Sequence, residues 1–256
     1  MAIDRQGRMT TLAPVEYQAQ FKQVIDDVIA HLKLSLNNRL HSIYVYGSVA
    51  KGQAVQYRSD LDLCLILTQK RNETEQRQLN EAHSYLEKTH DIVSKIDFDI
   101  GILADVIDEC NQFSWGYWLK HHCRCVFGDD LSLRFAPFLP SKDIAIAVNG
   151  DFVDVLTQYI DELKNTADAN KRRLIQRAAA RKLLRSTNIL RDNNDTSWPE
   201  SLNEHAERVM ALFPECKEQI HYFLQESYQP QDNTNIFISK LEHFILWLNK
   251  HYLQQQ

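Results

Sequence analysis

Apolar residues in the first half of the chain switch between helical and strand spacing. The repeat of apolar positions that follows Pro14 and continues to Leu32 predicts a helix, and a second helix is predicted over residues 73–90. Four short segments rich in aliphatic and aromatic residues are predicted as strands: residues 41–46, 61–67, 96–103 and 123–127. This order of elements predicts an α+β arrangement, a small mixed sheet with flanking helices.

The second half of the chain shows helical spacing and no convincing alternation. The pattern changes after the stretch that runs from Pro137 to Pro140. Helices are predicted over residues 146–164, 169–191, 200–212, 215–228 and 234–253. We therefore predict two domains, with residues 1–140 forming the sheet-containing domain and residues 141–256 forming an all-α helical bundle.

Composition and charge restrict the classes of function. The 256 residues include 44% hydrophobic and 25% charged side chains, as in an ordinary globular protein. A formal net charge of -5 disfavours a protein that holds a long stretch of nucleic acid through general positive potential. No apolar run approaches the roughly 18 residues of a membrane span, and the N-terminus lacks a signal-peptide core. The sparse cysteines predict reduced thiols, so we expect a cytoplasmic protein that binds neither nucleic acid nor membrane.

Two carboxylates open the second predicted strand. Asp60 and Asp62 are separated by one residue, so their side chains project from the same face of the strand, about 7 Å apart along the backbone. Such a pair can converge on shared divalent cations, and Mg²⁺ prefers oxygen ligands. The residues that follow, 63–67, are all apolar, which predicts a buried strand with its acids at one end.

A Gly-Ser turn precedes this acidic pair. Gly47 and Ser48 follow the first predicted strand, and eleven residues separate them from Asp60. A glycine permits close approach of the backbone to phosphate oxygens, and a serine hydroxyl with nearby backbone N–H groups can donate hydrogen bonds to them. The turn and the acids together predict a site for a phosphorylated ligand and divalent cations.

The combined pattern resembles that of nucleotidyltransferases with a DNA polymerase β-like catalytic domain. That family shows Gly-Ser, a short spacer, Asp-x-Asp and a third acid on a later strand. The matching segments here are Tyr46-Gly47-Ser48-Val49-Ala50-Lys51-Gly52 and Arg58-Ser59-Asp60-Leu61-Asp62-Leu63. With its helical second half, the chain looks most like bacterial small-molecule nucleotidyltransferases, including streptomycin and spectinomycin adenylyltransferases.

The resemblance implies a fold, a reaction and a set of site residues. It implies the polymerase β-like fold for residues 1–140, with ATP or another nucleoside triphosphate as donor and a small-molecule hydroxyl, such as that of an aminoglycoside, as acceptor. It implies that Asp60 and Asp62 ligate two Mg²⁺ ions. The residues that it implies for nucleotide binding are Gly47, Ser48, Lys51 and Ser59.

The third acid has two candidates on the strand predicted over 96–103. Asp97 and Asp99 alternate with apolar residues, so they share one strand face. By the resemblance we prefer Asp97 as the third metal ligand, because the family's acid usually sits between two apolar residues near the start of its strand. Asp99 meets that description nearly as well, and we keep both as catalytic candidates. The third acid is also expected to accept the proton of the acceptor hydroxyl.

A basic segment in the second half offers a further phosphate site. Arg177, Arg181 and Arg185 repeat at every fourth residue, so they share a helix face. We list Arg181 and Arg185 as candidate ligands of the triphosphate, and a solvated helix that pairs with acids elsewhere explains the spacing equally well. RNA binding is disfavoured because the patch is short and lacks interleaved aromatic residues.

Two other functions compete with small-molecule modification. One is a protein-modifying nucleotidyltransferase, as in the antitoxin-like minimal members of the superfamily, and the length of this chain disfavours it. The other is a catalytically silent nucleotide-binding module, which the intact acids Asp60 and Asp62 disfavour.

Overall fold

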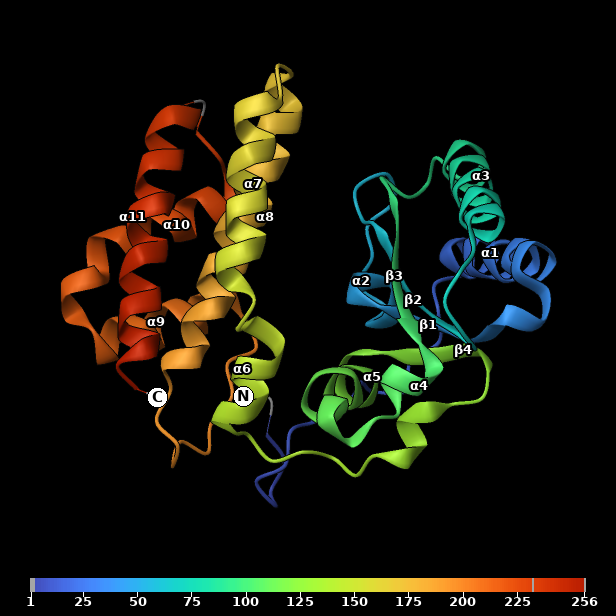
Figure 1. The fold of residues 1–256 in the computed structure, drawn as a ribbon, viewed down its shortest axis with the longest axis horizontal. Helices are drawn as coiled ribbons and strands as arrows, with labels where there is room; N and C mark the ends of the chain where they lie inside the picture. Colours follow the sequence, from blue (N-terminus) through green and yellow to red (C-terminus); the bar gives the residue numbers. More distant parts are fainter. Residues whose placement is uncertain (1–2, 232, 256) are drawn as a thin grey trace. The chain divides into compact units, whose positions relative to one another are not determined.

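The chain forms two compact units. The computed structural model describes residues 3–231 and 233–255. One unit spans Met9–Phe138, and the other comprises the chain from Leu139 onwards together with the N-terminal segment up to Arg8. The first unit holds a four-stranded sheet and the second is built of helices (Figure 1).

The sheet of the first unit is mixed, with strand order β3-β2-β1-β4. Its strands are β1 (Leu40–Tyr46), β2 (Leu61–Leu67), β3 (Ile96–Ile102) and β4 (Arg124–Gly128). Strand β1 pairs antiparallel with β2 and β4, and β2 pairs parallel with β3. The predicted small mixed sheet is confirmed, and each strand begins and ends within one residue of its predicted range.

Helices cover both faces of this sheet. On one face, α1 (Ala19–Leu36) and α3 (Glu73–Thr89) share a core with the apolar side chains of β1 and β2 (Figure 1). Helix α3 connects the parallel strands β2 and β3, and the side chains of Asn72 and Glu75 form a capping box at its start. The helix predicted from Pro14 begins later, at Ala19, because Gln18 still has an extended conformation.

The opposite face of the sheet carries the functional side chains. Tyr44, Cys64 and Ile66 are buried there against residues that include Leu119 of α5 (Tyr117–His122). Helix α4 (Leu103–Val106) follows β3 directly and contributes to the same cluster. Because alternate residues of a strand share a face, Asp62 belongs to the set of Cys64 and Ile66. Its carboxylate therefore points away from α1 and α3.

The second unit is a bundle around its own apolar core. Its helices are α6 (Lys142–Asn149), α7 (Phe152–Asn165), α8 (Ala169–Ser186), α9 (Leu202–Leu212), α10 (Lys217–Tyr228) and α11 (Thr234–Leu253). The side chains of Ser141, Asp168, Ser201 and Asn233 cap α6, α8, α9 and α11. Each cap accepts a hydrogen bond from a first-turn N–H that would otherwise lack a partner. The predicted all-α character is confirmed.

Two of the predicted helices do not continue over their whole range, and α6 begins at Lys142, four residues before the predicted start. The single helix predicted over 146–164 is two helices, α6 and α7, which meet at Gly150 and Asp151. The helix predicted over 169–191 changes to a 3₁₀ turn, Thr187–Leu190, after Ser186. Apolar spacing continues across both points, so hydrophobic periodicity alone did not reveal them.

Two further observations concern helix hydrophobicity and the cysteines. Within the described ranges, none of the helices is long and apolar enough to span a membrane. All five cysteines are free thiols, and Cys64, Cys123 and Cys216 are buried.

Candidate active site

Strand register brings three carboxylates together. Asp62 lies directly beside Asp97 in the parallel pairing of β2 with β3, and Asp60 immediately precedes β2. One oxygen from each of the three side chains lies within 4.8 Å of the others. Asp60 is exposed, whereas Asp62 and Asp97 are half-buried. The spacing of one residue on β2 and the register with β3 together produce this acidic cluster.

Burial and like charge change the protonation of Asp62. Burial, followed by the negative charges of Asp60, Asp97 and Asp99, raises the pKa of the Asp62 carboxyl to about 7. Ionising the Asp62 carboxyl in this position costs free energy when no cation is bound nearby. A divalent cation placed among the three oxygens of the cluster would remove that cost by neutralising them.

Gly47 occupies a position that disfavours any residue with a Cβ. It follows β1, whose last residue Tyr46 pairs with Asp62, and its φ is +70°, in the left-handed region. A Cβ built at Gly47 would collide with the carboxylate of Asp62. The glycine therefore allows the turn after β1 to pass directly beside the acidic cluster, as a backbone that contacts phosphates requires.

The neighbouring predicted nucleotide ligands lie around this turn. Ser48 belongs to the short helix α2 (Gly47–Ala50), and Lys51 is exposed at its end. The hydroxyl of Ser59 accepts a hydrogen bond from the Val55 N–H at 2.9 Å. The structure thus places Ser48 and Lys51 beside Gly47, and gives the Ser59 hydroxyl a partner within its own loop.

Asp97 and Asp99 differ in their surroundings. Asp97 belongs to the carboxylate cluster, and Asp99 lies further along β3, in register with Cys64. The hydroxyl of Tyr46 donates a hydrogen bond to Asp99 at 2.6 Å. Burial, and then this bond and the charge of Asp99, raise the pKa of Tyr46, so the phenol stays protonated. The preferred assignment of Asp97 as the third metal ligand fits this placement and stays a prediction.

Two residues of the site were missed by the sequence analysis. The hydroxyl of Ser94 donates a hydrogen bond to Asp60, and the ammonium group of Lys95 lies 2.6 Å from Asp97. Although partial burial opposes its charge, the hydrogen bond and ion pair with Asp97 raise the pKa of Lys95. Both residues precede β3, and the parallel pairing of β3 with β2 brings them to the acids. Their position just before an acid-bearing strand was the available signal.

The candidate arginines belong to the helical unit. Arg181 lies on α8 and donates a hydrogen bond through Nε to the carbonyl of Ser227 at 3.1 Å. Arg185 lies one turn later and is exposed. Lys182 on the same helix lies 2.6 Å from Asp151. Contact of Arg181 or Arg185 with a triphosphate stays a prediction.

Comparisons with known proteins agree with this geometry. Residues 31–112 match the profile of the family described as polymerase beta, nucleotidyltransferase, and that interval contains Gly47 and every acid of the cluster. No curated protein sequence matches the chain. Among solved structures, the chain is similar to spectinomycin adenyltransferase AAD(9) from Enterococcus faecialis, solved with ATP and spectinomycin. The match has a TM-score of 0.56 and 17% identity, and covers 88% of this chain and 99% of the other.

These findings identify a domain and a fold. The family match shows that residues 31–112 carry a polymerase β-like nucleotidyltransferase domain, which is that of a transferase. The structural match shows that the chain shares its fold with an adenyltransferase.

Proposed function

We propose that this polymerase β-like nucleotidyltransferase transfers AMP from ATP to a hydroxyl group of a small, polar, aminoglycoside-like acceptor in the cytoplasm, with two Mg²⁺ ions as cofactors. The observation that carries the proposal is the carboxylate cluster of Asp60, Asp62 and Asp97, directly beside the turn at Gly47. The acceptor class rests on the solved structure of similar fold, which holds ATP and spectinomycin.

The residues present fit Mg²⁺. The cluster offers three hard oxygen ligands within 4.8 Å of one another, and burial with like charge raises the pKa of Asp62 to about 7. In our proposal Asp60, Asp62 and Asp97 hold the ions. When bound, Mg²⁺ supplies Lewis-acid stabilisation of the charge that develops on the triphosphate.

The chain's own groups then position the donor and handle a proton. Gly47 and Ser48 offer backbone N–H groups and a hydroxyl to the phosphates, and Lys51 offers a positive charge. The acceptor oxygen attacks the α-phosphorus, the bond from that phosphorus to the bridging oxygen breaks, and pyrophosphate leaves. Asp97 accepts the proton of the attacking hydroxyl. Asp99, held by Tyr46, is the alternative acceptor of that proton.

Labelled ATP distinguishes the proposed function from its competitors. The enzyme is first screened by thermal shift with the four nucleoside triphosphates and Mg²⁺, since a ligand of the native state raises the midpoint by mass action. The best donor, labelled on the α-phosphate, is then incubated with aminoglycosides, aminocyclitols and other polyols. Label in a small-molecule product supports the proposal. Label on protein supports a protein-modifying enzyme, and binding without turnover supports a silent module.

An Asp62→Asn variant serves as the matched control for this assay. It keeps the side-chain shape and removes one charge from the cluster, so we expect turnover to fall at least about 100-fold, roughly 2.7 kcal/mol of barrier. We expect the variant to fold. Turnover close to that of the wild type in Mg²⁺ would exclude Asp62 as a metal ligand.

A further inference from the structure

A small polar cavity lies in the helical unit, apart from the residues assigned to catalysis. Its volume is about 10 Å³, and its walls come from the 3₁₀ turn after α8 and from one face of α9. The polar residues that line it are Thr187, Asn188, Arg191, His205 and Arg208. A space of this size admits one small ligand, such as a water molecule or a monatomic ion.

Arg191 is buried at this cavity, and its guanidinium group lies over the Trp198 ring, 4.9 Å from the ring centroid, with its hydrogen-bonding capacity only partly used. Its side chain is 1% exposed. Its Nη2 donates hydrogen bonds to the carbonyls of Asp195 at 2.5 Å and Ser197 at 2.9 Å. Its Nε and Nη1 atoms are buried and have no hydrogen-bond partner among the described residues. A guanidinium group has donors only, so these two atoms require an acceptor.

A neighbour adds to the demand for an acceptor. The amide nitrogen of Asn188 is buried and also lacks a partner within the described ranges, as does Nδ1 of His205. Burial, and then the charge of Arg185, lower the pKa of His205 to about 3, so its ring is neutral at neutral pH and adds no positive charge. Unpartnered donors of Arg191 and Asn188 thus belong to residues that line one small space.

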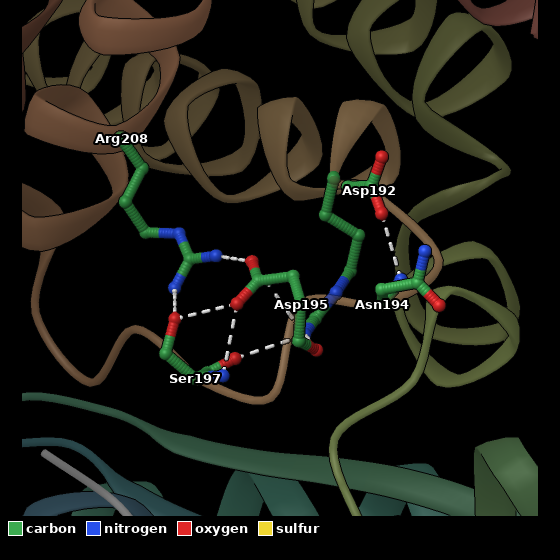
Figure 2. A network of polar contacts seen from close by, with 6 residues as sticks. Asp192, Asn194, Asp195, Ser197 and Arg208 are labelled. Carbon is green, nitrogen blue, oxygen red and sulfur yellow. Dashed lines mark hydrogen bonds and ion pairs between the residues drawn. The ribbon is translucent and has the colours of Figure 1, made fainter.

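The charges around the cavity do not balance. Asp195 forms ion pairs with both Arg208 and Arg191, the second at 3.7 Å. Figure 2 shows Arg208 reaching Asp195 and Ser197, with the Asp195 side chain also bonded to Ser197. One carboxylate therefore serves two guanidinium groups, and one positive charge remains. A water molecule accepts from at most two of these donors and carries no charge, whereas an anion accepts from all of them and neutralises the positive charge that remains.

We propose that the cavity formed by Asn188, Arg191, His205 and Arg208 binds a single small monovalent anion of the size of chloride. The anion accepts hydrogen bonds from Nε and Nη1 of Arg191 and from the Asn188 amide. It also neutralises the positive charge of the two arginines that Asp195 does not balance. It joins the turn after α8 to α9 and thereby stabilises the helical unit.

The test compares sodium chloride with sodium gluconate at constant ionic strength, because gluconate is too large for the cavity. The thermal midpoint of the full chain is measured in both salts. By mass action we expect a rise of about 3–5 °C when chloride exceeds its dissociation constant about tenfold. Equal midpoints in the two salts would overturn the proposal.

Two isosteric variants make the test specific. Asn188→Asp places a carboxylate among the donors, so we expect a higher midpoint in gluconate and no response to chloride. Asn194→Asp adds the same charge to an exposed residue of the neighbouring loop (Figure 2) and should respond to chloride as the wild type does. A chloride response of Asn188→Asp equal to that of Asn194→Asp would overturn the proposal.

Chloride-35 NMR gives a second readout that needs no variant. Chloride that exchanges between solution and the cavity should show excess linewidth in the presence of the wild-type protein, and added bromide should reduce it. The absence of any excess linewidth at millimolar chloride would contradict an anion site even if Asn188→Asp fails to fold.

Discussion

Two clusters of like charge, one in each unit, have similar physics and opposite sign. In the first unit, burial and the neighbouring acids raise the pKa of Asp62 to about 7. In the helical unit, burial and then the charge of Arg208 lower the pKa of Arg191 to about 10. Each shift favours the neutral form, and a bound ion of opposite charge would reverse it. Crowding of like charge is thus the physical sign of an ionic ligand in both places.

The clusters differ in how the sequence encodes them. The acids depend on strand alternation and on the register of β2 with β3, which are regular features. Arg191 and Arg208 meet through a 3₁₀ turn, an irregular loop and a helix face, and no fixed spacing relates them. Only the first arrangement has a pattern that can be read from the sequence.

Substituting the two acids of β3 one at a time should produce the largest effect on turnover. We expect Asp97→Asn to abolish turnover, because it removes a member of the carboxylate cluster. Asp99→Asn should retain a measurable fraction, because Asp99 contacts Tyr46 and lies outside the cluster. Parallel measurements of kcat on the two variants decide the assignment, and the reverse order of activities would make Asp99 the third acid.

Gly47→Ala should distort the acidic cluster without changing its charge. The new Cβ would collide with the Asp62 carboxylate, and a small displacement of a catalytic group can cost about 100-fold in rate. The matched control is Gly52→Ala. Gly52 has a similar φ of +67°, and its Cβ would meet only Val15 and the backbone of Glu16.

Both glycine variants should lose about 1–2 kcal/mol of stability through the left-handed backbone conformation. Only Gly47→Ala should also show a lower rate of nucleotidyl transfer. Urea unfolding and steady-state kinetics on both proteins give the comparison, and equal losses of rate would remove the special role of Gly47.

The Arg185→Ala variant tests whether Arg185, an exposed arginine of α8, contacts the phosphates of the nucleotide. We expect ATP binding to weaken by about 1.5–3 kcal/mol, the worth of hydrogen bonds to charged groups, while adenosine binding stays unchanged. Lys171→Ala, at an exposed residue in the first turn of the same helix, is the control. Calorimetric titration measures both ligands. Equal ATP affinity in the wild type and both variants would indicate that the basic residues of α8 are solvated and do not contact the nucleotide.

The regular parts of the fold were predictable from the sequence. Strand β2 was predicted at its observed limits, because its apolar run and the acids before it are strong local signals. The junction at Gly150 was missed because apolar spacing continues from α6 into α7. Local backbone geometry decides such a boundary, and hydrophobic periodicity carries little information about it.

The candidate site was predictable where it depends on short-range spacing. Gly47, Asp60 and Asp62 form a motif within sixteen residues of sequence, and this motif can be recognised without any knowledge of packing. Ser94 and Lys95 reach the acids only through the parallel pairing of β3 with β2. Their position just before an acid-bearing strand was a local signal, but the strand pairing that completes these contacts was not deducible from residue types.

The stability of Asp62→Asn should depend on pH in a way that separates charge crowding from metal binding. In the metal-free protein, burial and the neighbouring acids raise the pKa of Asp62 to about 7, above its ordinary value of 3.8. The folded state therefore holds an extra proton between these values. The stability from that proton is fully present below about pH 4 and is lost as the pH rises through 7.

Asparagine does not titrate, so the variant should become more stable than the wild type as the pH rises from 4 to 8. Solvent screening of this half-buried group limits the gain to about 1–2 kcal/mol, a few degrees in the thermal midpoint. Mg²⁺ should reverse the order at pH 8, because it binds the native wild type more tightly. Thermal unfolding at pH 4, 6 and 8, with and without Mg²⁺, measures both effects. A difference between variant and wild type that is independent of pH would contradict the raised pKa, and an order unchanged by Mg²⁺ would contradict the metal site.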